Sequence, residues 1–364
     1  MTATIRTAEE RESAGLGTDL VLRASDVSVE YAGARPTRAV REVSLELRRG
    51  EVLGIVGESG CGKSTLAFAL TRMLRPPARL TGGVIEYYGR DGEVTDLAAL
   101  EGERLREFRW GRVSMVFQSA MNALNPVTTV GSQIEDIFRA HRPQMGRAER
   151  RSRAGKLLEM VGIDPRRVRS FPHELSGGMR QRVVIAMALA LEPEIVVMDE
   201  PTTALDVLVQ REILDEIEAL RVELGFAVIF ITHDLALLME ISDRLAVMYA
   251  GRVVEYAPAE QVATAPLHPY TRGLLRSFPD LRGERRDLRG IPGSPPDLRN
   301  ALTGCPFAPR CESVFETCHE VSPELKAPAG GWPVACHLHD PQYARTGIDA
   351  GPGTDADTDS GDKA

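Results

Sequence analysis

The strongest constraint on this chain is a glycine-rich loop between an apolar strand and a helix. Residues 57–64, named here the phosphate loop, read GESGCGKS and follow the apolar run Val52–Val56. Glycines let successive backbone amides turn toward one anion, and the helix that follows adds the positive end of its dipole. Lys63 would neutralise phosphate charge and the Ser64 hydroxyl would bind Mg²⁺. We therefore expect a di- or triphosphate site formed by Gly57, Ser59, Gly60, Cys61, Gly62, Lys63, Ser64 and Thr65.

Strand and helix patterns alternate through the middle of the chain. Alternating apolar residues predict half-buried strands at 27–31 and 43–47. Short apolar runs predict further strands at 113–117, 195–198 and 227–231, and helical composition marks 132–160, 179–191 and 208–224. Strands that alternate with helices are typical of an α/β domain with a largely parallel sheet.

Two acidic residues end one of these predicted strands. The apolar segment 195–198 runs directly into Asp199 and Glu200. Ligands of such sheets bind outside the carboxyl ends of the strands. Asp199 would then hold Mg²⁺, usually through water, and Glu200 would orient or deprotonate an attacking water. Taken alone the pair also fits a helix cap before Pro201, and it is the phosphate loop that favours the catalytic interpretation.

A third motif opens another predicted helix. Ser176, Gly177 and Gly178 belong to the segment LSGGM. A serine and two glycines at the start of a helix suit a second anion site. They suit an ordinary helix cap equally well, and local physics does not choose between the two interpretations.

Composition bounds the remaining possibilities. The 364 residues include 52 acidic and 44 basic side chains, a formal net charge of −8. Proteins whose main task is to bind nucleic acid are more often basic, so we expect no nucleic-acid partner.

The longest apolar run, 183–191, has nine residues, whereas a membrane-spanning helix needs about 20. We expect a cytosolic chain with a disordered leader at 1–17, no secretory signal, and a disordered tail at 345–364.

Together the motifs resemble the ATP-binding cassette (ABC) ATPases. The phosphate loop, the LSGG segment and the strand end at Asp199 and Glu200 follow one another in the order of that family. The resemblance implies a P-loop NTPase domain at 18–262, with a mixed sheet, an antiparallel β subdomain and a helical subdomain at about 119–180. It also implies ATP and Mg²⁺ as ligands and ATP hydrolysis as the reaction.

Four further residues take their expected roles from this resemblance. Gln118 matches the glutamine that contacts Mg²⁺ or the lytic water, and His233 matches the histidine that grips the γ-phosphate. Asp206 matches the acid of the family's D-loop, and Tyr31 matches the aromatic residue that stacks on adenine. Glu200, Gln118 and His233 thus form the expected catalytic set.

The chain carries one copy of each motif. In the ABC family, ATP lies between the phosphate loop of one domain and the LSGG segment of another. The resemblance therefore implies a second ATPase subunit, which is either another copy of this chain or a homologue. Two function classes stay open, the motor subunit of a membrane transporter and a soluble ABC ATPase of translation or DNA repair. A single cassette without a long coiled-coil insert favours the transporter.

The C-terminal part indicates which subgroup of the ABC ATPases the chain resembles. Its segments HPYTRGLLRSFP (268–279), IPGSPPDL (291–298) and GCPFAPRC (304–311) resemble the C-terminal extension of oligopeptide and dipeptide importer ATPases, which nickel importers share. The resemblance implies such an extension at 263–344, two membrane permease subunits, an extracellular solute-binding protein, and a peripheral position on the cytoplasmic face of the cell membrane. Peptides are the expected cargo, and oligosaccharides or nickel are the alternatives.

Four of the five cysteines lie in this extension, namely Cys305, Cys311, Cys318 and Cys336. Their spacing differs from the tight pairing of zinc ribbons. Four thiolates can hold an iron–sulfur cluster, and the resemblance allows a [4Fe–4S] centre. Zinc, or reduced thiols without a metal, are the alternatives.

Overall fold

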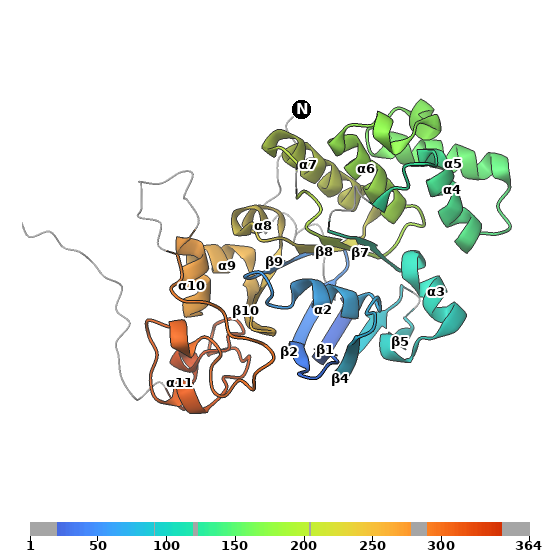
Figure 1. The fold of residues 1–364 in the computed structure, drawn as a ribbon. Helices are drawn as coiled ribbons and strands as arrows, with labels where there is room; N and C mark the ends of the chain where they lie inside the picture. The colour runs from blue at the N-terminus through green and yellow to red at the C-terminus, as the bar shows by residue number, and fades with distance from the viewer. Residues whose placement is uncertain (1–19, 91, 119–122, 204, 278–289, 344–364) are drawn as a thin grey trace, which may run out of the picture.

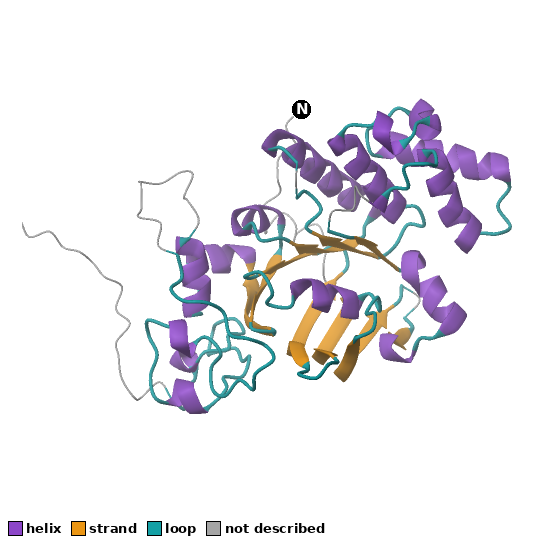
Figure 2. Cartoon of the chain, in the orientation of Figure 1, coloured by secondary structure: helices purple, strands orange, loops and turns teal. Residues whose placement is uncertain are grey.

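The architecture consists of two β-sheets with helices packed around them (Figure 1 and Figure 2). It is seen in a computed structural model, which describes residues 20–90, 92–118, 123–203, 205–277 and 290–343. The leader predicted at 1–17 and the tail predicted at 345–364 lie outside these residues. Among the described residues, no helix is both long and apolar enough to cross a membrane.

The larger sheet has six strands in the order β10-β9-β3-β8-β7-β6. Its strands are β3 (Val52–Val56), β6 (Val113–Val116), β7 (Ile195–Asp199), β8 (Ala227–Ile231), β9 (Arg244–Tyr249) and β10 (Arg252–Pro258). All neighbours pair in parallel except β9 and β10, which are antiparallel. Strands β3, β6, β7 and β8 are buried along their whole length, which explains why their sequences are mostly apolar. The predicted mixed α/β sheet is confirmed.

The smaller sheet is antiparallel, with the order β2-β1-β4-β5. It consists of β1 (Leu20–Tyr31), β2 (Thr37–Arg48), β4 (Ala78–Tyr88) and β5 (Val94–Asp96). The alternating residues at 27–31 and 43–47 lie in β1 and β2, and both strands extend well beyond the predicted segments. Alternation marks these strands because one face of the sheet is buried and the other is more exposed.

The helices surround the larger sheet. They are α2 (Lys63–Leu70), α3 (Gly102–Gly111), α4 (Val130–His141), α5 (Arg147–Met160), α6 (Gly177–Ala188), α7 (Val207–Leu224) and α8 (Leu235–Ile241), with 3₁₀ turns η1 (Leu97–Ala99), η3 (Pro165–Arg169) and η4 (Pro172–Glu174). The helical segment predicted at 132–160 is divided into α4 and α5. The division falls at Pro143, because the residue before a proline is disfavoured in a helix. Figure 1 shows α4, α5 and α6 gathered at one end of the molecule.

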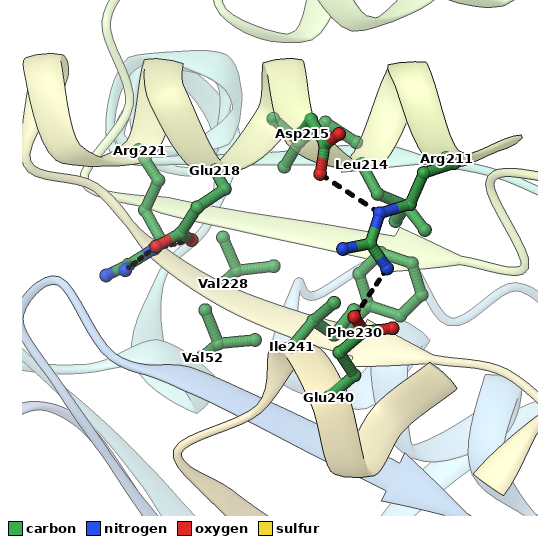
Figure 3. A pocket seen from close by; sticks show the side chains of 11 residues that line it. Val52, Arg211, Leu214, Asp215, Glu218, Arg221, Val228, Phe230, Glu240 and Ile241 are labelled. Carbon is green, nitrogen blue, oxygen red and sulfur yellow. Dashed lines mark hydrogen bonds and ion pairs between the residues drawn. The ribbon is translucent and has the colours of Figure 1, made fainter. Parts of the chain in front are cut away.

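Helix α7 covers the sheet over a small apolar cavity of about 40 Å³ (Figure 3). Leu214 and Ile217 of α7 and Val228 and Phe230 of β8 are among the residues that line it. Ion pairs lie at its edge, including Arg211 with Glu240 of α8 at 2.5 Å. A space of this size holds at most a few water molecules, so it is too small for a nucleotide.

Where the structure describes it, the C-terminal part contains only short helices, as the sequence predicts. They are α9 (Ala259–Thr264), α10 (Pro269–Arg276), η5 (Ala308–Arg310), α11 (Thr317–Glu320) and η6 (His337–His339). It packs along the outer edge of β10. There the Ala335 amide donates to the Val254 carbonyl at 2.8 Å, and the Tyr256 amide donates to the Pro333 carbonyl at 2.9 Å. This segment therefore extends the hydrogen bonding of the larger sheet by a short stretch.

Candidate nucleotide site

The phosphate loop joins β3 to α2 in a conformation that requires glycine at two positions. Gly57 has φ of 156° and Gly62, the residue before α2, has φ of 107°. A Cβ atom on Gly57 would lie 2.2 Å from the Met248 carbonyl oxygen, and one on Gly62 would lie 2.2 Å from the Ala39 carbonyl oxygen. Both backbones therefore pass closer to their neighbours than any other residue type allows.

Lys63 lies inside this loop. Its Nζ atom donates to the carbonyl oxygens of Gly57 at 2.7 Å and Glu58 at 3.0 Å, and the residue is 8% exposed. The loop is therefore curled around the ammonium group that would meet a phosphate. Cys61 is buried at the same place, and burial raises the pKa of its thiol. A protonated thiol of this kind acts as a small apolar filler.

Ser64 and Asp199 meet at the carboxyl ends of β3 and β7. The Ser64 side chain lies close enough to the Asp199 carboxylate to influence its pKa. Burial raises the pKa of Asp199, and Ser64 and Lys63 oppose this effect. A hydroxyl beside a buried carboxylate supplies the hard oxygen ligands that Mg²⁺ prefers, so these two residues fit the expected ion.

Glu200 is the centre of a second cluster. Gln118 Nε2 donates to its Oε2 at 2.9 Å, the Thr203 hydroxyl donates to the same oxygen at 3.1 Å, and His233 Nδ1 lies 3.3 Å from Oε1. Glu200 has a positive φ of 48°, which is uncommon for a residue with a side chain. The three predicted catalytic residues are thus brought together, along strained backbone of the kind found at functional sites.

Tyr31 lies beside the first turn of α2. Its hydroxyl is 3.0 Å from the hydroxyl of Thr65, and the side chain is partly exposed at the end of β1. The smaller sheet therefore contributes one aromatic ring next to the phosphate loop. This position agrees with a contact to a bound nucleotide, although the stacking role on adenine stays a prediction.

The LSGG segment and Asp206 lie at other helix starts. The Ser176 hydroxyl accepts from the Met179 amide at 3.3 Å, and the Asp206 carboxylate accepts from the Val209 amide at 3.0 Å. Both side chains therefore cap helices, α6 and α7. Figure 1 shows α2 and α6 on opposite sides of the larger sheet. The chain thus presents its phosphate loop and its LSGG segment at separate places.

Comparison with known proteins fits this arrangement. A model of the ABC transporter family matches residues 40–203, and a model of the oligopeptide/dipeptide transporter C-terminal region matches 254–318. A protein of Sinorhizobium fredii named "Probable peptide ABC transporter ATP-binding protein" is 45% identical over 87% of this chain and 95% of its own length. The chain belongs to the ABC transporter ATP-binding proteins.

Two further comparisons support this ABC ATPase assignment. The dipeptide transport ATP-binding protein DppD of Caldanaerobacter subterraneus is 39% identical over 88% of this chain and 98% of its own length. A solved dimer of the ATP-binding cassette MJ0796, bound to ADP and phosphate, has a TM-score of 0.57 and 30% identity. That alignment covers 65% of this chain and 98% of the cassette. The ABC ATPase is therefore an ATP-hydrolysing subunit of the transporter class, as the sequence predicts.

The cysteines of the extension give the iron–sulfur prediction no support. In the part of the chain that the structure describes, no group of three or more His, Cys, Asp or Glu residues could hold a metal ion. Burial raises the pKa of Cys305 to about 11 and that of Cys336 to about 12. Burial therefore favours the protonated thiol at these two positions. Neither a [4Fe–4S] centre nor zinc has support among the described residues.

Sequence reasoning missed several residues of the ABC ATPase site. Thr203 binds Glu200, but a threonine three residues after a glutamate is too common a pattern to carry a prediction. Tyr270 and Arg310 contact Glu58 of the phosphate loop from the C-terminal extension. Both occur in segments that the resemblance singled out, but nothing in their sequence pattern points to the loop.

Proposed function

We propose that this ABC ATPase is the motor subunit of a membrane importer for oligopeptides or dipeptides. The observation that carries the proposal is that the phosphate loop, the Ser64–Asp199 pair and the Glu200 cluster lie together at one edge of the sheet. The same chain matches the oligopeptide/dipeptide transporter C-terminal region. Two relatives are named for peptide or dipeptide transport. Oligosaccharide and nickel cargo are the alternative outcomes.

The proposed reaction is hydrolysis of ATP to ADP and phosphate. The amides of the phosphate loop and Lys63 would bind the phosphates, and Ser64 and Asp199 would hold Mg²⁺, which would neutralise phosphate charge. A water attacks the γ-phosphorus, its proton passes to the Glu200 carboxylate, and the bond to the ADP oxygen breaks. Gln118 and His233 orient Glu200 and the γ-phosphate.

A second subunit completes the site in this proposal. The LSGG segment of that subunit, with its Ser176, Gly177 and Gly178, would cover the nucleotide held by the phosphate loop of the first. Val207 and Leu208, next to Asp206, are 80% and 78% exposed. Two exposed aliphatic side chains together are typical of a surface that another protein covers. Either a second copy of this chain or a homologous subunit would fit.

Leu208→Glu is expected to weaken nucleotide-dependent pairing of the cassettes by about tenfold or more. A glutamate buried without a partner at an interface loses its hydration and gains nothing in return. The measurement is the molecular mass in solution with and without Mg-ATP. Val222→Glu is the matched control, because Val222 lies on the same helix and is 45% exposed. Equal effects of the two variants would contradict the assignment of this surface.

The permease subunits are proposed to dock beside the Glu200 cluster. Phe117, next to Gln118, is 41% exposed, and Val127 of the following loop is 78% exposed. A partner that covers these side chains would also touch the residue that binds Glu200, and could therefore transmit movement to the catalytic site. In this proposal the ATPase lies peripherally at the cytoplasmic face of the membrane, and an extracellular solute-binding protein supplies the cargo.

The proposal is tested by reconstitution of the ATPase with its two permease subunits in vesicles. Addition of the solute-binding protein loaded with peptide is expected to stimulate ATP hydrolysis and to move peptide across the vesicle membrane. The same assay with oligosaccharide or nickel tests the alternatives. Failure of the chain to copurify with any permease would contradict the motor role.

A further inference from the structure

The C-terminal extension reaches the phosphate loop through one buried arginine. Arg310 Nη1 lies 2.7 Å from Glu58 Oε2, and Nη2 lies 2.9 Å from Glu58 Oε1. Each terminal guanidinium nitrogen thus binds a different carboxylate oxygen, the paired geometry that the planar fork of arginine provides. The Arg310 side chain is 5% exposed and that of Glu58 is 25% exposed. The ion pair is therefore largely shielded from water.

Glu58 is the second residue of the phosphate loop, and its backbone is fixed as well. Its amide donates to the Tyr270 hydroxyl at 2.9 Å, and its carbonyl accepts from Lys63 Nζ at 3.0 Å. Tyr270 lies in α10 and is fully buried. Two residues from the C-terminal part thus hold the side chain and the amide of one loop residue.

Arg310 is itself held in place before any nucleotide binds. Its Nε donates to the Pro292 carbonyl at 2.8 Å, and Nη1 lies 3.2 Å from the Tyr249 hydroxyl. The guanidinium also lies over the rings of Tyr249 and Phe307, at 5.8 and 6.0 Å from their centres. The donor fork aimed at Glu58 is therefore preorganised by the extension together with Tyr249 of β9.

We propose that Arg310 is a positioning residue for the phosphate loop, and that through it the C-terminal extension sets the affinity of the ATPase for ATP. The loop binds phosphate with its backbone amides, so its affinity depends on how those amides are directed. Arg310 and Tyr270 fix the loop at Glu58, immediately before the amides of Ser59 to Lys63. The catalytic cluster at Glu200 contains neither residue, so the rate of the chemical step should be affected little.

Arg310→Ala in the full chain is expected to raise the KM for ATP about tenfold and to leave kcat within about twofold. Arg310→Lys should recover part of the affinity, because lysine keeps the charge but cannot bind both carboxylate oxygens. Arg276→Ala is the control, since Arg276 lies in the same extension and forms an exposed ion pair with Glu312. It should leave both constants unchanged.

A double-mutant cycle separates this role from simple support of the fold. Glu58→Ala should raise KM as Arg310→Ala does, and the double variant should be no worse than the worse single one. Tyr270→Phe, which keeps the aromatic packing and removes the hydroxyl, should raise KM by a smaller factor even if Arg310→Ala is poorly folded. An unchanged KM in folded Arg310→Ala and in Tyr270→Phe, or fully additive effects in the cycle, would overturn the inference.

The inference rests on ATP as the ligand of the phosphate loop. Binding of ATP by the unmodified chain tests that premise separately. The variants test only whether the extension controls the affinity for ATP. A failure of the unmodified chain to bind ATP can therefore be distinguished from a failure of the variants to change that affinity.

Discussion

Glu200→Gln is expected to slow ATP hydrolysis by about 10²–10⁴-fold while ATP binding is retained. The Glu200 carboxylate is the group on which Gln118, Thr203 and His233 converge. Glutamine keeps the shape of the side chain but is not a base at neutral pH. The attacking water would then keep its proton, and ATP would remain in the site.

The measurement combines phosphate release with molecular mass in the presence of Mg-ATP. The variant should hydrolyse little ATP and should accumulate as a nucleotide-bound pair of cassettes. Glu223→Gln, at an exposed position of α7, is the control and should behave like the unmodified chain. Phosphate release at the original rate in Glu200→Gln would show that another group accepts the proton.

Asp199→Asn is expected to abolish Mg²⁺-dependent hydrolysis and, without nucleotide, to raise the free energy of unfolding by about 1–3 kcal/mol. Asp199 is 2% exposed, and burial raises its pKa. An ionised carboxylate in this place destabilises the fold until a cation neutralises it. Asparagine removes the charge and keeps the size, but it is a poorer ligand for Mg²⁺.

The sign of the pH dependence follows from the same pKa shift. Because the folded-state pKa of Asp199 is raised, the folded chain binds more protons at this site than the unfolded chain between the two pKa values. The contribution of Asp199 to stability therefore falls as pH rises through that window, and the penalty is fully present above the folded-state pKa. Thermal unfolding at several pH values, with and without Mg-ATP, measures it. An Asn variant less stable than the unmodified chain at neutral pH without nucleotide would refute the argument.

Much of the larger sheet and of the nucleotide site could be predicted, because each part is specified by adjacent residues in the sequence. The residues of β3 and β8 are consecutive apolar runs, and the phosphate loop is defined by eight adjacent positions. A strand that is buried on both faces has an almost wholly apolar sequence, so it is easily recognised. The location of Asp199 and Glu200 at the end of a buried strand could be predicted for the same reason.

The parts that could not be predicted depend on contacts between distant segments. Strand β4 pairs with β1 across more than 40 residues, and nothing near Ala78–Tyr88 specifies that partner. The bond between Glu58 and Arg310 joins residues 252 positions apart. The four cysteines show a different difficulty, because their number and the family resemblance allowed an iron–sulfur cluster, for which the described residues give no support.

The hydrogen bonds between the C-terminal segment and β10 have a consequence for shortened forms of the chain. Strand β10 is the last strand at one side of the six-stranded sheet, and Val254 and Tyr256 bond to Ala335 and Pro333. Removal of the extension would leave these backbone groups unpaired, and bare outer strands recruit other chains. A chain truncated after the ATPase domain would therefore tend to self-associate through the exposed edge of β10, and this association would not depend on nucleotide.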